Sequence, residues 1–181
     1  MERVVQEILI TEEQIQNRIK ELGKKITEDY KGKEILAICV LKGASIFMAD
    51  LVRHIQVPLK FDFIAVSSYG DSTFSLGAVK ILKDIDQDIA GKDVLLIEDI
   101  VDTGYTLNYL FRIFGARNPK SLKVCTLLSK PSRRKIDVKV DYCGFDVPDE
   151  FVVGYGLDFR GYYRNYPYIF TLKEEIYRQE I

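Results

Sequence analysis

The apolar positions in the first part of the chain recur with the period of a helix. Residues 11–32 place isoleucine and leucine at spacings of four, three and four, which brings them to one face of a helix. Thr11 and Gln14 have the spacing of a capping box, and Gly32 suits the end of a helix. The pattern therefore predicts an amphipathic helix with four buried positions. These positions are Ile15, Ile19, Leu22 and Ile26.

Strands and helices alternate after this helix. Residues 33–41 form an apolar run without polar alternation, which is typical of a strand buried on both faces. Residues 67–77 are rich in Ser, Thr and Gly without periodicity, which indicates a loop. The alternation predicts an α/β fold in which helices cover both faces of a mostly parallel sheet. The other strands are expected at 60–66, 92–99 and 121–128, and the helices at 43–55 and 106–117.

The pattern changes beyond residue 135, where short aromatic segments and turns replace the alternation. A chain of 181 residues has the size of one domain. We expect a single domain, residues 1–181, with a core at about 30–140. A small hood is expected from the N-terminal segment and from about 141–181. The aromatic segments of the tail are 140–145, 151–159 and 166–172.

Composition narrows the class of protein. The net charge is −1, so there is no general attraction to nucleic acid or anionic lipid, and neither partner is expected. No apolar run approaches the roughly 18 residues of a membrane helix, and the N-terminus lacks the layout of a signal peptide. Cys39, Cys125 and Cys143 have no CxxC spacing, which predicts free thiols in a reducing, cytoplasmic location. His54 is the only histidine, which argues against a histidine triad or a multi-histidine metal site.

The segment 94–107, VLLIEDIVDTGYTL, carries the candidate chemistry. Its first part is a strand that brings Glu98 and Asp99 to a carboxyl end, where ligands bind in open α/β sheets. The following DTGYT turns the chain into a helix, whose first N–H groups and positive dipole end suit an anion. A simpler interpretation is that Asp102 or Thr103 only caps the helix. That interpretation leaves the two preceding acids unexplained.

Three other motifs could account for parts of the sequence, and each lacks residues that its site requires. A Walker-B strand also ends in acids, but it needs a P-loop, and GKE at Gly32 and GKD at Gly91 lack the required residues. Asp-Thr-Gly is also the aspartic-protease signature, but it occurs once, and a helical pattern follows it. GYGLDF at Gly154 lacks the third glycine of a dinucleotide fingerprint and a following helix.

The same segment closely resembles the phosphoribosyl-pyrophosphate signature of type I phosphoribosyltransferases. The resemblance extends to LKGA, SSYGDST, LLSKPSRR and residues 141–165, which follow the order of the hypoxanthine-guanine phosphoribosyltransferase family. It implies a type I phosphoribosyltransferase fold, with a central sheet flanked by helices and a small hood. It also implies transfer of the 5-phosphoribosyl group from phosphoribosyl pyrophosphate to hypoxanthine or guanine, with Mg²⁺.

The resemblance assigns the residues around the sugar. Glu98 and Asp99 correspond to acids that meet the ribose hydroxyls, directly or through magnesium, and Asp158 to an acid near magnesium bound to pyrophosphate. Arg164 corresponds to a pyrophosphate contact. The Lys42–Gly43 peptide corresponds to one that can adopt a cis form and expose N–H groups to pyrophosphate. The 5-phosphate would be held by the loop of Asp102, Thr103, Gly104, Tyr105 and Thr106.

The resemblance also assigns the residues around the purine. Asp102 corresponds to the acid near N7 that takes or shares its proton, and Lys130 to the donor for the 6-oxo group. Phe151 would stack on the base and Val152 would meet its edge. Without the resemblance, Lys130 is an ordinary solvated lysine and Phe151 and Val152 are core residues. A lid over the reacting centre is expected around Ser68, Tyr69 and Gly70.

The chain departs from the family pattern at three positions. Tyr105 stands where some members have Lys, Ser129 where bacterial relatives often have Asp, and Leu76 where a small polar residue is common. A xanthine-preferring enzyme and a nucleic-acid-binding regulator with the same fold are the alternatives. The family also implies a homodimer or homotetramer, and the aromatic side chains of the tail could line its contacts. They are Tyr162, Tyr163, Tyr166, Tyr168 and Phe170.

Overall fold

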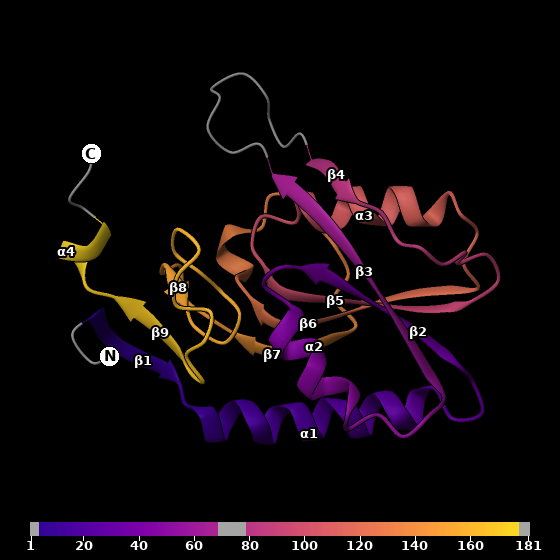
Figure 1. The fold of residues 1–181 in the computed structure, drawn as a ribbon, viewed down its shortest axis with the longest axis horizontal. Coiled ribbons are helices and arrows are strands. Elements are labelled where there is room, and N and C mark those ends of the chain that lie inside the picture. Colours follow the sequence, from indigo (N-terminus) through magenta and orange to yellow (C-terminus); the bar gives the residue numbers. More distant parts are fainter. Residues whose placement is uncertain (1–3, 69–78, 178–181) are drawn as a thin grey trace.

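A six-stranded sheet forms the centre of the computed structural model, which describes residues 4–68 and 79–177 (Figure 1). The β3–β4 pair is antiparallel and every other neighbouring pair is parallel. The predicted α/β class with a mostly parallel sheet is therefore confirmed. In spatial order the strands are β4 (Val79–Lys83), β3 (Leu59–Ser68), β2 (Ile35–Leu41), β5 (Asp93–Val101), β6 (Ser121–Ser129) and β7 (Tyr142–Asp146).

Helices cover both faces of this sheet (Figure 1). Helices α1 (Glu12–Asp29) and α2 (Ser45–Val52) share one buried cluster with it, and α3 (Tyr105–Gly115) packs on the other face. Among the described residues, no helix is long and apolar enough to cross a membrane.

The first helix follows its predicted pattern. The amide of Gln14 donates to Oγ1 of Thr11 at 3.2 Å, and the amide of Thr11 donates to Oε1 of Gln14 at 2.8 Å, so the capping box is confirmed. All four predicted apolar positions are buried, and each such side chain contributes about 1.5–3 kcal/mol. The helix ends at Asp29, earlier than Gly32, which lies in the following turn.

A smaller, three-stranded sheet carries the tail and the N-terminal segment. It contains β1 (Val5–Ile10), β9 (Ile169–Leu172) and β8 (Val152–Val153), all antiparallel, and a short helix α4 (Glu174–Tyr177) follows. The hood boundary expected near residue 141 is wrong, because β7 pairs in parallel with β6 and belongs to the larger sheet. The hood begins after that strand.

The strand register brings three strand ends to one edge of the larger sheet. Cys39 lies opposite Ile97, so Leu41 at the end of β2 reaches the level of Asp99. Val101 lies opposite Ser129, and the amide of Lys130 donates to the Val101 carbonyl at 2.9 Å. The residues that follow β2, β5 and β6 therefore meet at the edge where α/β sheets bind ligands.

Candidate active site

The loop between β5 and α3 is shaped by its backbone. Gly104 is the N-cap of α3 with φ +90°, and it makes no side-chain capping bond. The interpretation of Asp102 or Thr103 as a simple cap is therefore wrong. The Thr103 carbonyl accepts hydrogen bonds from the amides of Lys135 at 3.0 Å and Ile136 at 3.1 Å. The segment that follows β6 thus holds the loop in place. The first-turn N–H groups of a helix have no partner inside the helix and can bind an anion.

Glycine is required at the centre of this loop. A Cβ atom on Gly104 would lie 2.6 Å from the carbonyl oxygen of Ile136, and residues with side chains rarely adopt this positive φ.

The helix that follows Asp-Thr-Gly differs from the strands that an aspartic protease needs, so the interpretation of Asp-Thr-Gly as an aspartic-protease signature is wrong.

Two acids, the buried Glu98 and the partly buried Asp99, lie near the end of strand β5. Glu98 is 5% exposed, and burial together with the charge of Asp99 raises its pKa well above the usual range. Burial also raises the pKa of Asp99 to about 6, although the amide of Ile100 donates to Oδ1 at 2.7 Å. Among the described residues, no basic side chain forms an ion pair with either acid. A cation or sugar hydroxyls beside the pair would favour the carboxylate forms, because they oppose the burial and the repulsion that raise these pKa values.

The end of β2 packs against these acids. The cis peptide bond joins Leu41 to Lys42, so the position expected from the resemblance, Lys42–Gly43, is wrong by one residue. A Cβ atom on Gly43 would lie 1.4 Å from Oδ2 of Asp99. A Cβ atom on Gly156 would lie 2.0 Å from the Gly43 carbonyl oxygen. Two glycines thus let the end of β2, the end of β5 and the hood approach closely.

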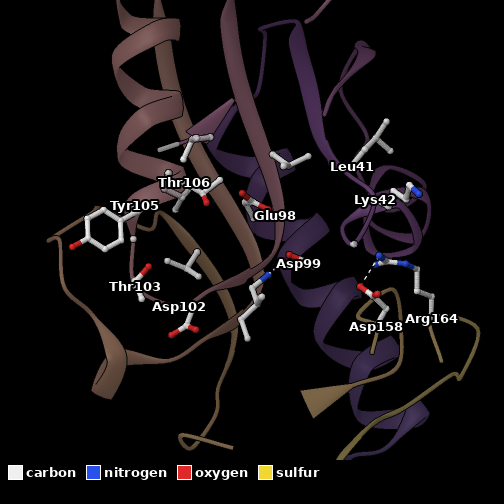
Figure 2. A pocket seen from close by; sticks show the side chains of 17 residues that line it. Leu41, Lys42, Glu98, Asp99, Asp102, Thr103, Tyr105, Thr106, Asp158 and Arg164 are labelled. Carbon is white, nitrogen blue, oxygen red and sulfur yellow. Dashed lines mark hydrogen bonds and ion pairs between the residues drawn. The ribbon is translucent and has the colours of Figure 1, made fainter. Parts of the chain in front are cut away.

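The larger cavity at this edge has a volume of about 450 Å³. Figure 2 shows Asp102, Thr103, Tyr105 and Thr106 on one side and Asp158 with Arg164 on the other. Glu98 and Asp99 lie between them. Nη2 of Arg164 is 2.6 Å from Oδ1 of Asp158, and Nη1 donates to the Gly156 carbonyl. The predicted site residues that line this cavity are Lys42, Gly43, Glu98, Asp99, Asp102, Thr103, Gly104, Tyr105, Thr106, Asp158 and Arg164.

A second cavity of about 260 Å³ adjoins the first. Lys130 lines it and is only 7% exposed, and its Nζ donates to the Glu150 carbonyl at 2.6 Å. Its interpretation as a solvated lysine is therefore wrong. Phe151 is 50% exposed rather than part of the core, whereas Val152 is buried. The residues shared by both cavities are Asp99, Ile100, Asp102 and Asp158.

The carboxylate of Asp102 has a partner that the sequence did not reveal. Nε of Arg133 lies 2.9 Å from Oδ1 of Asp102, and Nη1 of the same arginine lies 3.1 Å from Oδ1 of Asp149. In the sequence, only its position in the basic run after Lys130 pointed to Arg133 as a residue of the site. Hydrophobic wall residues were also missed, because their chemistry is that of ordinary core. They are Val40, Leu41, Val79, Ile100, Val101, Leu107 and Leu157.

Part of the predicted lid lies outside the described residues. Ser68 is the last residue of β3, and Tyr69, Gly70 and Leu76 fall in the segment 69–78, which the structure does not describe.

The predicted metal ligands are acids of the larger cavity. Within residues 4–68 and 79–177, no three Asp, Glu, His or Cys side chains are grouped to hold a metal ion by themselves. Glu98, Asp99 and Asp158 nevertheless fit Mg²⁺, because this ion usually takes only one or two carboxylates and completes its shell with water and phosphate oxygens. Glu98 and Asp99, which form no ion pair within the part of the chain that the structure describes, would supply the charge for such a cation.

Comparisons with known proteins agree with this geometry. A family model described as phosphoribosyl transferase domain matches residues 6–160. The chain is 55% identical over 177 residues to a hypoxanthine-guanine phosphoribosyltransferase of Bacillus subtilis, covering 98% of each chain. It is 51% identical over 179 residues to that of Streptococcus thermophilus, covering 99% of each.

A solved structure has the same fold. The crystal structure of a hypoxanthine phosphoribosyltransferase from Staphylococcus aureus matches with a TM-score of 0.92 and 51% identity, covering 96% of this chain and 94% of that chain. The fold expected from the resemblance is therefore confirmed. With its signature loop, its sheet topology and a matching domain over most of its length, this chain belongs to the phosphoribosyl transferase domain family.

Proposed function

We propose that this protein acts as a hypoxanthine-guanine phosphoribosyltransferase in purine salvage. It transfers the 5-phosphoribosyl group from phosphoribosyl pyrophosphate to hypoxanthine, giving IMP, or to guanine, giving GMP, and releases pyrophosphate. The observation that carries the proposal is the pair of adjoining cavities joined at Asp102. One has an anion-binding loop beside the acids Glu98 and Asp99, and the other has a buried lysine beside an exposed aromatic ring.

The larger cavity would place hydrogen-bond donors at the phosphate of a sugar phosphate and carboxylates at its sugar ring. Backbone N–H groups and the hydroxyls of Thr103 and Thr106 would hold the 5-phosphate. Glu98 and Asp99 would lie along the ribose hydroxyls. Positive charge develops on the sugar ring as pyrophosphate leaves, as it does in glycoside cleavage. The two carboxylates stabilise that charge more strongly in the transition state than in the ground state.

The smaller cavity suits a 6-oxopurine. Lys130 can donate to the 6-oxo group, and its Nζ already donates to the Glu150 carbonyl beside it. The face of Phe151 offers a stacking surface, and the backbone of Val152 meets the base edge. Asp102 lies in both cavities, so its carboxylate can take or share the proton at purine N7 while the base attacks the sugar.

Pyrophosphate would occupy the opposite end of the larger cavity. Arg164 has the planar donor fork that suits phosphate oxygens, and the backbone of Lys42 and Gly43 would supply further contacts. Mg²⁺, when bound at Glu98, Asp99 and Asp158, would neutralise part of the pyrophosphate charge. Ser68 and Tyr69 would contribute to a lid over the reacting centre.

The protein is proposed to work in the cytoplasm as a homodimer or homotetramer. The free thiols of Cys39, Cys125 and Cys143 suit a reducing compartment. Tyr162 is 70% exposed on the aromatic tail, and aromatic side chains are enriched at subunit contacts.

A base competition assay tests the proposal. The purified protein is mixed with Mg²⁺, phosphoribosyl pyrophosphate and hypoxanthine, guanine, xanthine or adenine, and nucleotide formation is followed. Hypoxanthine and guanine should react, and adenine should be rejected by about 10⁴-fold, because an ammonium donor cannot pair with its amino group. Comparable use of adenine would contradict the 6-oxopurine assignment. Faster use of xanthine would identify a xanthine-preferring enzyme.

A further inference from the structure

Arg133 bridges two acids: Asp102, which lines the smaller cavity, and Asp149, which lies two residues before Phe151 of the same cavity. It lies in a turn of 3₁₀ helix, Pro131–Arg133, directly after Lys130. Its Nε contacts Asp102 at 2.9 Å and its Nη1 contacts Asp149 at 3.1 Å. Arg133 lines neither cavity, so it approaches the Asp102 carboxylate from outside the space that a ligand would fill.

This contact distinguishes the two oxygens of Asp102. Oδ1 is buried, makes no hydrogen bond within the described residues, and faces Nε of Arg133 in an ion pair at 2.9 Å, whereas the side chain as a whole is 39% exposed. The exposed part of the carboxyl group therefore includes the other oxygen, which remains available to the cavity. A carboxylate held through one oxygen has a restricted rotation, and its second oxygen keeps a defined direction.

The second contact of Arg133 is with Asp149, in the segment that carries Phe151, the proposed stacking ring for the purine. Asp149 is followed by Glu150, whose carbonyl accepts from Lys130 Nζ, and then by Phe151. Two cations of this turn thus bind the segment 149–151: Lys130 through the Glu150 carbonyl and Arg133 through the Asp149 carboxylate. The position of the stacking ring is in this way tied to the position of the Asp102 carboxylate.

We propose that Arg133 is a positioning residue for the transfer reaction, which aligns Asp102 with a purine stacked on Phe151. The inference rests on the proposed function and deepens it. The planar guanidinium is suited to this role, because it holds two acids at once in a fixed relative geometry. A lysine at this position would place a single point charge and could not reproduce both contacts in the same plane.

The bridge is exposed enough to be removed without unfolding the protein. Arg133 and Asp149 are 46% and 55% exposed, and exposed ion pairs contribute little to stability. The Arg133→Gln variant should therefore unfold at the wild-type temperature. Its kcat should fall between about 10- and 100-fold, because a misplacement of about 1 Å can cost about 100-fold in rate. Its KM for hypoxanthine should rise, whereas its KM for phosphoribosyl pyrophosphate should stay unchanged.

The Asp149→Asn variant separates the two arms of the bridge. It keeps the Arg133 contact to Asp102 and weakens the anchor to Phe151, so its KM for hypoxanthine should rise several-fold with a smaller loss of kcat. The double variant should be no slower than Arg133→Gln alone, because both substitutions break one connected unit. Arg53→Gln is the matched control, since Arg53 is 77% exposed, forms an ion pair with Asp50 at 3.6 Å and lines neither cavity.

These measurements separate failure of the inference from failure of the function. Wild-type protein that forms no IMP or GMP refutes the proposed function. Active wild-type protein with an unchanged or raised kcat in Arg133→Gln refutes the positioning role alone. If the fold-losses in kcat of Arg133→Gln and Asp149→Asn multiply in the double variant, the proposed link between Asp102 and Asp149 is refuted. If Arg133→Gln does not fold, an unchanged KM for hypoxanthine in Asp149→Asn overturns the proposal by itself.

Discussion

Gly43 leaves the space that the Asp99 carboxylate fills: a Cβ atom at this glycine would lie 1.4 Å from Oδ2 of Asp99. The two residues come from the ends of adjacent parallel strands, β2 and β5. Any side chain at position 43 must displace the acid from the cavity wall. Asp99 can therefore keep its position near the end of β5 only if the residue after β2, Gly43, has no side chain.

Replacement of Gly43 by alanine is therefore expected to disturb the site strongly. Overpacking of this kind costs about 1–3 kcal/mol, and a displaced Asp99 would no longer face the sugar, so activity should fall steeply. Thermal denaturation and steady-state kinetics measure both effects. Gly115→Ala is the matched control, because nothing lies within 4 Å of its added Cβ and the residue ends helix α3. That variant should be unchanged or slightly stabilised, and equal behaviour of the two variants would contradict the packing argument.

Asp99 should make stability depend on pH. Its pKa is about 6 in the folded protein against 3.8 for an ordinary Asp, because burial disfavours the charged form. A raised pKa stabilises the fold below pH 3.8 and loses that stabilisation as pH rises through about 6. The loss is up to about 3 kcal/mol. Asp99→Asn should remove this part of the pH dependence, so at pH 7.5 it should be more stable than the wild type while losing activity.

Urea denaturation at several pH values between 4 and 7.5 provides the measurement. The wild type should lose stability relative to Asp99→Asn as the pH rises through this window. Parallel curves for the two proteins would show that Asp99 is not the titrating group. The expected gain in stability with loss of activity is the behaviour of a charge kept buried for binding a ligand rather than for folding.

The sequence alone was sufficient for the features that lie close together along the chain. Glu98, Asp99 and the loop Asp102–Thr106 occupy one strand-to-helix connection, so the spacing of residue types already fixes their relative placement. The first helix was equally legible, because its capping box and apolar face are local. Its predicted end was late by less than one turn, since Tyr30 is already its C-cap.

Features that depend on distant partners could not be predicted. Strands β1 and β4 are edge strands, and their exposed residues dilute the apolar pattern that identifies a strand. Strand β7 joins the larger sheet through pairing with β6, which its aromatic composition does not reveal. The Arg133 contact to Asp102 arises only once the turn after β6 packs on the loop after β5. No local spacing encodes that approach.

Lys130 should control the choice of base. Its Nζ lies buried at the cavity wall, 2.6 Å from the Glu150 carbonyl, and its donors match a 6-oxo acceptor. Lys130→Gln should lower kcat/KM for hypoxanthine by about 100-fold or more and leave adenine a poor substrate. The ratio of kcat/KM for hypoxanthine to that for adenine should therefore fall. The control is Lys135→Gln, an exposed lysine of the same basic run. An unchanged ratio in Lys130→Gln would exclude the 6-oxo contact.

Asp102 is expected to be required for turnover and dispensable for folding. Its side chain is 39% exposed, so replacement by asparagine keeps the shape of the loop and should leave the unfolding temperature close to that of the wild type. Asparagine cannot accept the N7 proton, and kcat should fall by about 100- to 10,000-fold, the range of general-base catalysis. Binding of phosphoribosyl pyrophosphate should persist, because the phosphate is held by backbone N–H groups and threonine hydroxyls of the same loop. Calorimetric titration of the variant with phosphoribosyl pyrophosphate and Mg²⁺ separates the two effects. Retained binding with lost turnover assigns Asp102 to proton transfer, whereas an unchanged kcat would remove it from that role.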